Sequence, residues 1–203
     1  MSQEKIKMEN RTTRRIVVST AMTIVIALGM VSKTVRAAEL KELMGAVGMN
    51  MLIKRSEAPD FMLKNLKGED VKLSDYRNKI VLLNFMATWC HWCKKEMPHL
   101  QKLHEKYSDR DFAIVVVFQD REGASAVVPF MKKSGYTFAV SSGLLDPTGE
   151  VGNQYGVTGT PTTLLIDRTG NIIAWGIGYR DWFSQSAIDL VGNLLTSPKI
   201  SKK

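Results

Sequence analysis

Two cysteines lie three residues apart in the run Trp89-Cys90-His91-Trp92-Cys93, and they are the only cysteines among 203 residues. A Cys-x-x-Cys pair can cycle between a dithiol and a disulfide by thiol–disulfide exchange. Structural bracing is the alternative, but so short a disulfide loop removes little entropy from the unfolded chain. The pair therefore predicts redox chemistry rather than a structural link.

The segments around the pair predict that it lies at the start of a helix. Residues 80–85 form an apolar run typical of a buried strand, and residues 94–107 carry apolar side chains at helical spacing. Unpaired backbone N–H groups and the dipole at a helix N-terminus stabilise a thiolate. We expect Cys90, as the more exposed thiol, to be the nucleophile and Cys93, as the more buried one, to resolve the mixed disulfide.

Two further elements could assist this chemistry, each with a simpler alternative. Glu96 lies three residues beyond Cys93, where its carboxylate could accept the thiol proton, but it could equally be a surface residue paired with a lysine. A cis bond at Pro161 would leave the backbone of Thr160 free to pair with an extended client. Because only about 5–6% of X–Pro bonds are cis in folded proteins, the residues alone favour trans.

The side chains beside the cysteines are candidates for client binding. A protonated His91 would stabilise a neighbouring thiolate and make the disulfide more oxidising, and a solvent-facing histidine of little effect is the alternative. Trp92 could cover the second cysteine or form part of an apolar docking surface, and Trp89 is expected to pack beside the site. His99 and His104 have no partner acid evident in the sequence, so neither is assigned a role.

The N-terminal residues have the layout of a secretory signal. Basic residues lie among residues 5–15, an uncharged run covers residues 16–31, and Val35-Arg36-Ala37 is compatible with cleavage after Ala37. An uncleaved anchor is the alternative, although the run is short for the roughly 20 residues that span a membrane. Export would place the cysteines in an oxidising, extracytoplasmic compartment, for which we expect the periplasm.

Charge and composition exclude several classes of partner. Without residues 1–37 the net charge falls from +8 to +3, because this segment holds seven basic and two acidic residues. So mild a charge, with no basic stripe interleaved with aromatics, argues against nucleic acid. No glycine-rich phosphate loop is present, so no nucleotide is expected, and no cofactor or metal site is assigned.

The chain divides into a signal or anchor, a lead-in helix or linker, one folded domain and a polar tail: residues 1–37, 38–56, 57–195 and 196–203. Strand and helix patterns alternate in the domain, which predicts an α/β fold with a central mixed sheet flanked by helices. A β-hairpin over residues 60–73 is expected as an N-terminal extension. Further strands are expected over residues 112–118, 136–140, 162–167 and 172–175. Further helices are expected over residues 123–134, 150–155 and 181–195, with Asp181 as the last N-cap.

These segments together resemble the TlpA/ResA-like branch of the thioredoxin superfamily, which consists of exported thiol-disulfide oxidoreductases. The matching motifs are Ala58-Pro59-Asp60-Phe61, Leu73-Ser74-Asp75-Tyr76, Ala87-Thr88-Trp89-Cys90, Cys93-Lys94-Lys95-Glu96-Met97-Pro98 and Gly159-Thr160-Pro161-Thr162. The resemblance implies a thioredoxin fold, a cis-proline at Pro161 facing the disulfide, and a functional Glu96. It also places Asn84 where cytoplasmic thioredoxins carry a buried acid.

Two positions depart from that branch. Trp92 stands where a proline usually precedes the second cysteine, and Met86 stands where an aromatic residue is usual. The dipeptide between the cysteines strongly influences the reduction potential in this superfamily. The His91-Trp92 pair therefore leaves the direction of electron flow open.

The resemblance implies an enzyme that reduces disulfides of exported proteins, with apocytochrome c before haem attachment as a candidate client. We expect a monomer, although the residues leave the oligomeric state open. Electrons would come from a membrane protein, because nothing in the chain predicts a bound nicotinamide or flavin. A disulfide oxidase or isomerase is the first alternative. A copper-binding assembly factor is a second alternative, but it would require a Cys-x-x-x-Cys spacing. A peroxiredoxin-like peroxidase would require a proline that residues 83–90 lack.

Overall fold

A computed structural model describes residues 35–139 and 142–196 of the chain. The chain separates into two compact units, Met1–Lys41 and Glu42–Lys203. The proposed signal or anchor lies outside the described residues except for residues 35–37, which are helical. None of the described helices is both long enough and apolar enough to cross a membrane. The polar tail beyond Thr196 also lies outside the described residues.

The second unit is built on a mixed eight-stranded sheet in the order β1-β8-β7-β4-β5-β6-β2-β3. Its strands are β1 (Asn50–Glu57), β2 (Met62–Asn65), β3 (Asp70–Lys72), β4 (Ile80–Met86), β5 (Phe112–Phe118), β6 (Gly143–Leu145), β7 (Thr162–Ile166) and β8 (Asn171–Ile177). Strands β4, β5 and β6 are parallel to one another, and the remaining pairs are antiparallel. This is the predicted α/β class with a mixed sheet.

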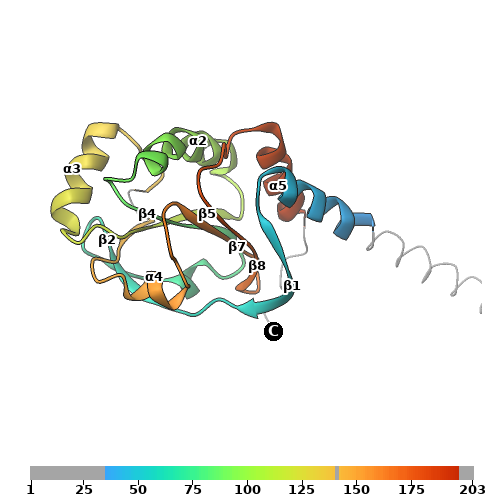
Figure 1. Cartoon of the computed structure of the whole chain (residues 1–203), viewed down its shortest axis with the longest axis horizontal. Helices are drawn as coiled ribbons and strands as arrows, with labels where there is room; N and C mark the ends of the chain where they lie inside the picture. Colours follow the sequence, from blue (N-terminus) through green and yellow to red (C-terminus); the bar gives the residue numbers. More distant parts are fainter. Residues whose placement is uncertain (1–34, 140–141, 197–203) are drawn as a thin grey trace, which may run out of the picture. The chain divides into compact units, whose positions relative to one another are not determined.

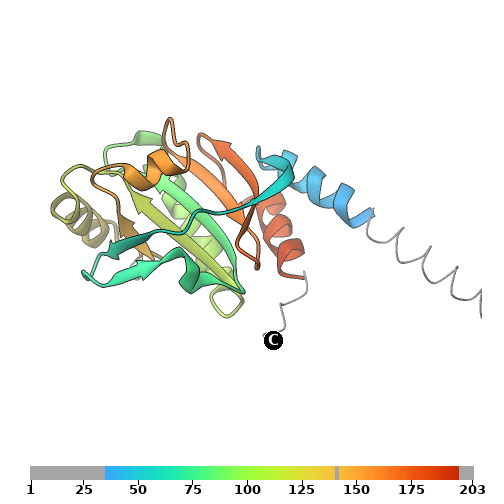
Figure 2. The same cartoon turned by 90° about the horizontal axis from the view of Figure 1, so that it is seen from below.

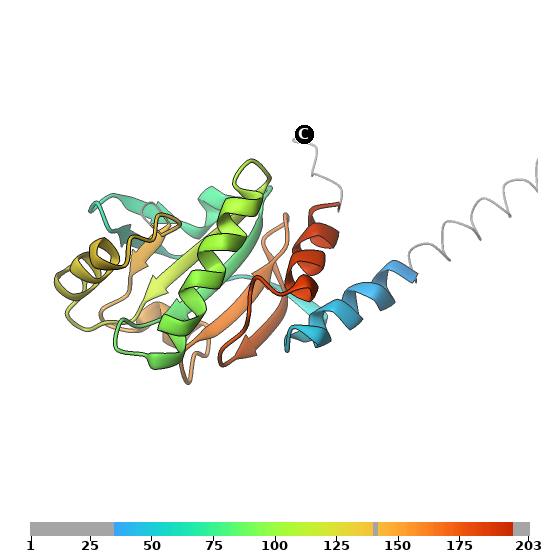
Figure 3. The same cartoon turned by 90° about the horizontal axis from the view of Figure 1, so that it is seen from above.

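Helices cover both faces of the sheet. They are α2 (His91–Tyr107), α3 (Ala124–Ser134), α4 (Glu150–Gln154) and α5 (Gln185–Leu195), with a 3₁₀ turn η1 (Leu73–Tyr76). Helices α2 and α5 lie side by side on one face, as Figure 3 shows, and α4 lies on the opposite face (Figures 1 and 2). The Tyr107 hydroxyl donates to the Ile188 carbonyl at 2.8 Å and so links α2 to α5.

The centre of the sheet is apolar because it is covered on both faces. All seven residues of β4 are buried, as are six of the seven in β5. Such continuous apolar runs are typical of strands that have no solvent-facing side. On α2 the residues Met97, Leu100 and Leu103 are fully buried, which matches the helical spacing read from the sequence. Strand β4 and helix α2 thereby fix the position of the two cysteines between them.

The predicted β-hairpin is confirmed. Strands β2 and β3 pair antiparallel, and β2 also pairs with β6, which joins the hairpin to the edge of the sheet. The Asn65 side-chain oxygen accepts from the amides of Lys67 and Glu69 and stabilises the turn. An asparagine that closes a turn in this way explains why the hairpin could be predicted from neighbouring residues alone.

The lead-in segment differs from its prediction. Residues 35–46 are helical, but the chain then turns at Gly48, whose φ is +70°, and continues as β1. Strand β1 pairs antiparallel with β8, so the sheet begins before Glu57, where the domain was expected to start. Pairing with the free edge of β8 satisfies backbone groups, and this tertiary contact overrides the weak helical pattern.

Two other local expectations were wrong. Residues 136–139 are not a strand, and the short strand of this region is β6 instead. Helix α5 is capped by Ser184, whose hydroxyl accepts from the Ala187 amide, rather than by Asp181. The Asp181 carboxylate pairs with His99 Nδ1 at 2.7 Å, so a histidine that had no evident partner acid has one. That partner lies too far along the chain to be inferred from helical spacing.

Candidate active site

The two cysteines form a disulfide at the beginning of α2, as their spacing predicted. Cys90 is the N-cap residue, and its Sγ accepts a hydrogen bond from the Cys93 amide at 3.2 Å. Cys90 is 6% exposed and Cys93 is 1% exposed. A negative charge on Cys90 would therefore be stabilised by the helix N-terminus, and Cys93 is shielded from solvent.

The loop before the cysteines is held by a buried aspartate that sequence reasoning missed. Asp120 follows β5, and its carboxylate accepts from the Thr88 amide at 3.0 and 3.1 Å and from the Thr88 hydroxyl. Asp120 is 1% exposed, so these bonds satisfy a carboxylate removed from water. They fix the backbone that leads into Cys90.

The peptide bond between Thr160 and Pro161 is cis. This agrees with the resemblance and overturns the trans bond that the residues alone favoured. The Thr160 carbonyl oxygen lies 3.5 Å from Cys90 Sγ, so the loop before β7 contacts the sulfur that was expected to react. Thr160 and Pro161 therefore adjoin the disulfide, although they lie about 70 residues further along the chain.

Glu96 is a buried residue and not a surface partner of a lysine. It is 1% exposed and lies one helical turn beyond Cys93 on α2. Its Oε1 accepts from the Trp182 indole N–H at 2.7 Å and from the Arg180 amide at 3.2 Å. Its Oε2 accepts from the Asn84 side-chain amide at 3.1 Å, and that amide also donates to the Thr163 hydroxyl at 3.0 Å.

Burial raises the pKa of Glu96 from 4.5 to about 7. The hydrogen bonds from Trp182 and Asn84, the charge of Arg180 and its amide oppose the effect of burial, but they do not cancel it. The carboxyl can therefore hold or release a proton near neutral pH. The sequence located this acid, but only the structure shows the burial that sets its pKa.

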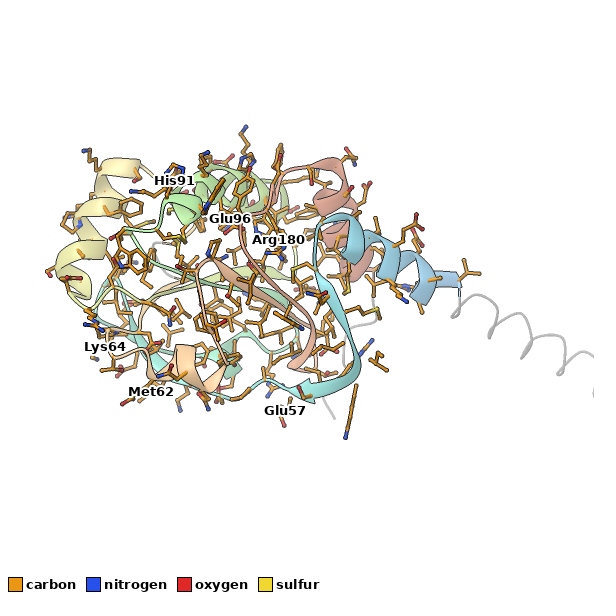
Figure 4. The ribbon with its side chains drawn as sticks, in the orientation of Figure 1. Glu57, Met62, Lys64, His91, Glu96 and Arg180 are labelled. Carbon is orange, nitrogen blue, oxygen red and sulfur yellow. A yellow bond between two sulfur atoms is a disulfide. The ribbon has the colours of Figure 1, made fainter. Side chains whose placement is uncertain are left out.

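Arg180 connects the acid to the segment before the sheet, and Figure 4 shows it beside Glu96. Its guanidinium donates to the carbonyls of Gly178 at 2.6 Å and Gly48 at 2.7 Å. Desolvation lowers the pKa of Arg180, and the charge of Glu96 raises it. The loop over residues 178–183 thus supplies the surroundings of Glu96. Its dense set of charged and aromatic residues was the only sequence signal for this role.

Replacing Trp182 with phenylalanine is expected to raise the pKa of Glu96 further, because the carboxylate loses its 2.7 Å donor. Hydrogen bonds to charged groups contribute roughly 1.5–3 kcal/mol, which corresponds to a shift of about one unit or more. The midpoint of the pH dependence of disulfide reduction should move upward accordingly. Trp175→Phe is the matched control, because Trp175 is partly exposed on β8 and has no bond to Glu96. An unchanged midpoint in Trp182→Phe would contradict the assignment.

The three candidates for client binding are all exposed. Trp89 was expected to pack beside the site, but 68% of its surface is exposed. Trp92 is 52% exposed, and its ring lies 5.9 Å from the ring of Tyr179 at an angle of 42°. His91 is exposed at the start of α2, and its ring meets the edge of Trp92 at 5.4 Å. These side chains flank the two cysteines in the sequence, and none of the three is buried.

The fold and the site define a thioredoxin-like protein with a Cys-x-x-Cys disulfide at the N-terminus of a helix. The sequence model of the AhpC/TSA family matches residues 55–175, more than half of the chain, so the chain belongs to this family. Among curated proteins, it is similar to Thiol-disulfide oxidoreductase ResA of Bacillus thuringiensis subsp. konkukian (strain 97-27). The two are 39% identical over 117 residues, which are 58% of this chain and 65% of that protein.

Other relatives agree with this assignment. Thiol-disulfide oxidoreductase ResA of Geobacillus kaustophilus (strain HTA426) is 41% identical over 117 residues, with the same shares of both chains. The match thus spans just under two thirds of these curated relatives. The crystal structure of a putative thiol:disulfide interchange protein DsbE from Chlorobium tepidum is 32% identical, with a TM-score of 0.64. That comparison covers 71% of this chain and 99% of the other.

Proposed function

We propose that the protein is an extracytoplasmic thiol-disulfide oxidoreductase that reduces disulfides of exported proteins. One observation carries the proposal: the buried member of the disulfide lies one turn from a buried carboxyl group whose pKa is about 7. A structural disulfide needs no such group, whereas a resolving thiol needs a proton acceptor close to it. The names of the relatives, which are thiol-disulfide oxidoreductases, support the same chemistry.

Reduction of a client proceeds by two exchanges from the dithiol form. The Cys90 thiolate attacks one client sulfur, which forms a bond between Cys90 and the client and releases the other client sulfur as a thiolate. The Cys93 thiolate then attacks Cys90 Sγ, which closes the disulfide and releases the second client sulfur. Two electrons pass from the protein to the client, and the two client thiolates take up protons.

Glu96 serves the second exchange. Cys93 is buried, so its thiol must lose a proton to a group inside the protein before it can attack. The ionised Glu96 carboxylate accepts that proton and later returns it to solvent or to the departing client thiolate. Trp182, Asn84 and the Arg180 amide position the carboxylate and limit the rise in its pKa.

The client would lie across the loop that holds the cis-proline. Thr160 is next to Cys90 Sγ, and its backbone could pair with an extended client, while Pro161 would face the disulfide as the resemblance implies. Trp89, His91 and Trp92 would line the approach to the sulfur.

The protein would act as a monomer and would receive electrons from a membrane protein. Apocytochrome c is a candidate client, and N-terminal export or anchoring would place the chain in the periplasm.

The reduction potential of the Cys90–Cys93 couple tests this function. We expect a value near that of thioredoxin, about −270 mV, when the full chain is equilibrated with defined thiol buffers. A value near that of DsbA, about −120 mV, would overturn the reductant assignment and make the protein an oxidant or isomerase. His91→Pro and His91→Ser, measured in the same buffers, would then show how far the dipeptide sets the potential.

A further inference from the structure

Exposed aromatic rings follow α2 from the disulfide toward the middle of the helix, where Tyr179 contacts Trp92 and Phe183 lies near Lys102. Three segments contribute these rings: the loop before α2, the first turn of α2, and the loop between β8 and α5. Trp89, Trp92, Tyr179 and Phe183 are 68%, 52%, 39% and 36% exposed, respectively. Exposed large apolar side chains that gather in one place mark interaction sites more often than isolated ones do.

Two lysines of α2 lie on these rings. The Lys95 ammonium is 4.7 Å from the centroid of Trp92, and the Lys102 ammonium is 5.7 Å from the centroid of Phe183. Both distances lie within the range of cation–π attraction, which positions each charge over an apolar surface. We call these six residues the aromatic-lysine surface: Trp89, Trp92, Tyr179, Phe183, Lys95 and Lys102.

The exposed charged side chains of α2 are mostly positive. Helix α2 has exposed side chains at four lysines, one histidine and one glutamate, namely Lys94, Lys95, Lys102, Lys106, His91 and Glu105. The other glutamate of the helix, Glu96, is buried. The carboxylate of Asp181 in the facing loop is paired with His99 at 2.7 Å. A partner that approaches Cys90 therefore meets apolar rings and the lysines of α2, with Asp181 as the one acid of the facing loop.

We propose that the aromatic-lysine surface selects clients whose reactive disulfide is flanked by acidic side chains. This inference rests on the proposed function, because it names the class of substrate for the same disulfide. Carboxylates of the client would pair with Lys95 and Lys102, and apolar side chains next to its cysteine would pack on Trp92 and Tyr179. A client with lysines at those positions would bring like charges together, which disfavours encounter.

Three peptides of equal length test the proposal. Each carries one intramolecular disulfide, flanked by aspartates, serines or lysines, and each is mixed with the fully reduced protein in a single turnover. Loss of the protein dithiol is followed by acid quench, alkylation and mass spectrometry. Each rate is divided by the rate with dithiothreitol, which removes differences in the reactivity of the peptides themselves.

We expect the aspartate peptide to react about fivefold faster than the serine peptide at low ionic strength, roughly what two exposed ion pairs provide. The preference should shrink as salt is added, because exposed charges are screened. The double variant Lys95→Glu, Lys102→Glu should instead favour the lysine peptide. Lys132→Glu, Lys133→Glu is the matched control with the same change of net charge on α3, and it should keep the preference of the natural protein.

The outcomes separate this inference from the proposed function. If the serine peptide is not reduced at all, the proposed function fails. If all three peptides react at equal normalised rates, or if the α3 control changes the preference as much as the α2 variant, the inference fails and the proposed function stands. A reversal confined to the α2 variant supports both.

Discussion

A protein with Cys93 replaced by serine is expected to capture its clients without releasing them. Cys90 remains the more exposed of the two cysteines, at the N-terminus of α2, so we expect it still to attack a client disulfide. No thiol then remains to attack Cys90 Sγ, because the chain holds only these two cysteines. Turnover should be abolished, and a covalent adduct of protein and client should accumulate. Non-reducing electrophoresis and mass spectrometry of the intact adduct provide the measurement.

Cys90→Ser is the matched control for this experiment. It keeps Cys93, which is 1% exposed and should not reach a client sulfur, so no adduct is expected. If Cys90→Ser formed adducts and Cys93→Ser did not, the roles of the two cysteines would be reversed. The same pair of variants, used with a mixture of exported proteins, would enrich physiological clients on Cys93→Ser alone.

Replacing Glu96 with glutamine is expected to slow the release of the client about a hundredfold at neutral pH, the lower end of what a positioned proton acceptor contributes. In the natural protein the rate of this step should fall about tenfold per pH unit below pH 7, where the carboxyl becomes protonated. The glutamine variant should lack this inflection. Rapid-quench measurement of mixed-disulfide decay between pH 5 and 9 gives both quantities.

The same substitution should change stability in a way that depends on pH. Because the pKa of Glu96 is raised, the folded protein keeps a proton between the ordinary glutamate value of 4.5 and about 7, where the unfolded chain has lost it. The contribution of Glu96 to stability is therefore greatest below pH 4.5 and is lost as the pH rises to 7. Relative to the natural protein, Glu96→Gln should gain about 3 kcal/mol in unfolding free energy between pH 4 and pH 8.

Denaturant unfolding of the disulfide form at both pH values checks this result. Glu105→Gln is the control, because Glu105 is an exposed glutamate on the same helix. A Glu96→Gln variant that was slow but showed no pH-dependent gain in stability would contradict a pKa near 7. One that reduced clients at the natural rate would remove Glu96 from the mechanism.

Short-range patterns account for the parts of the fold that the sequence predicted. The apolar run of β4, the helical spacing of α2 and the turn at Asn65 are each set by neighbouring residues, and each is found where expected. The cysteines could be placed for the same reason, since a strand and a helix that follow each other closely determine the junction between them.

Long-range contacts account for what could not be predicted. Glu96 is next to Cys93 in the sequence, yet its partners Arg180 and Trp182 lie 84 and 86 residues away. Whether Glu96 is buried or exposed depends on that distant loop, so the sequence left both alternatives open. In the same way, β1 forms by pairing with the edge of β8. The Asp181 carboxylate pairs with His99 on α2 instead of capping α5. Such distant partners cannot be predicted from the pattern of neighbouring residues.

The hydrogen bond from Arg180 to the Gly48 carbonyl has a practical meaning for anyone who prepares this protein. A chain trimmed to begin at Glu57 would look complete by its motifs, yet it would lack almost all of β1 and one of the acceptors of that guanidinium. The exposed edge of β8 would invite strand pairing between copies. Arg180 would keep its bond to Gly178 but lose the one to Gly48, and measurements on the trimmed protein would describe a disulfide whose neighbouring acid, Glu96, has altered surroundings.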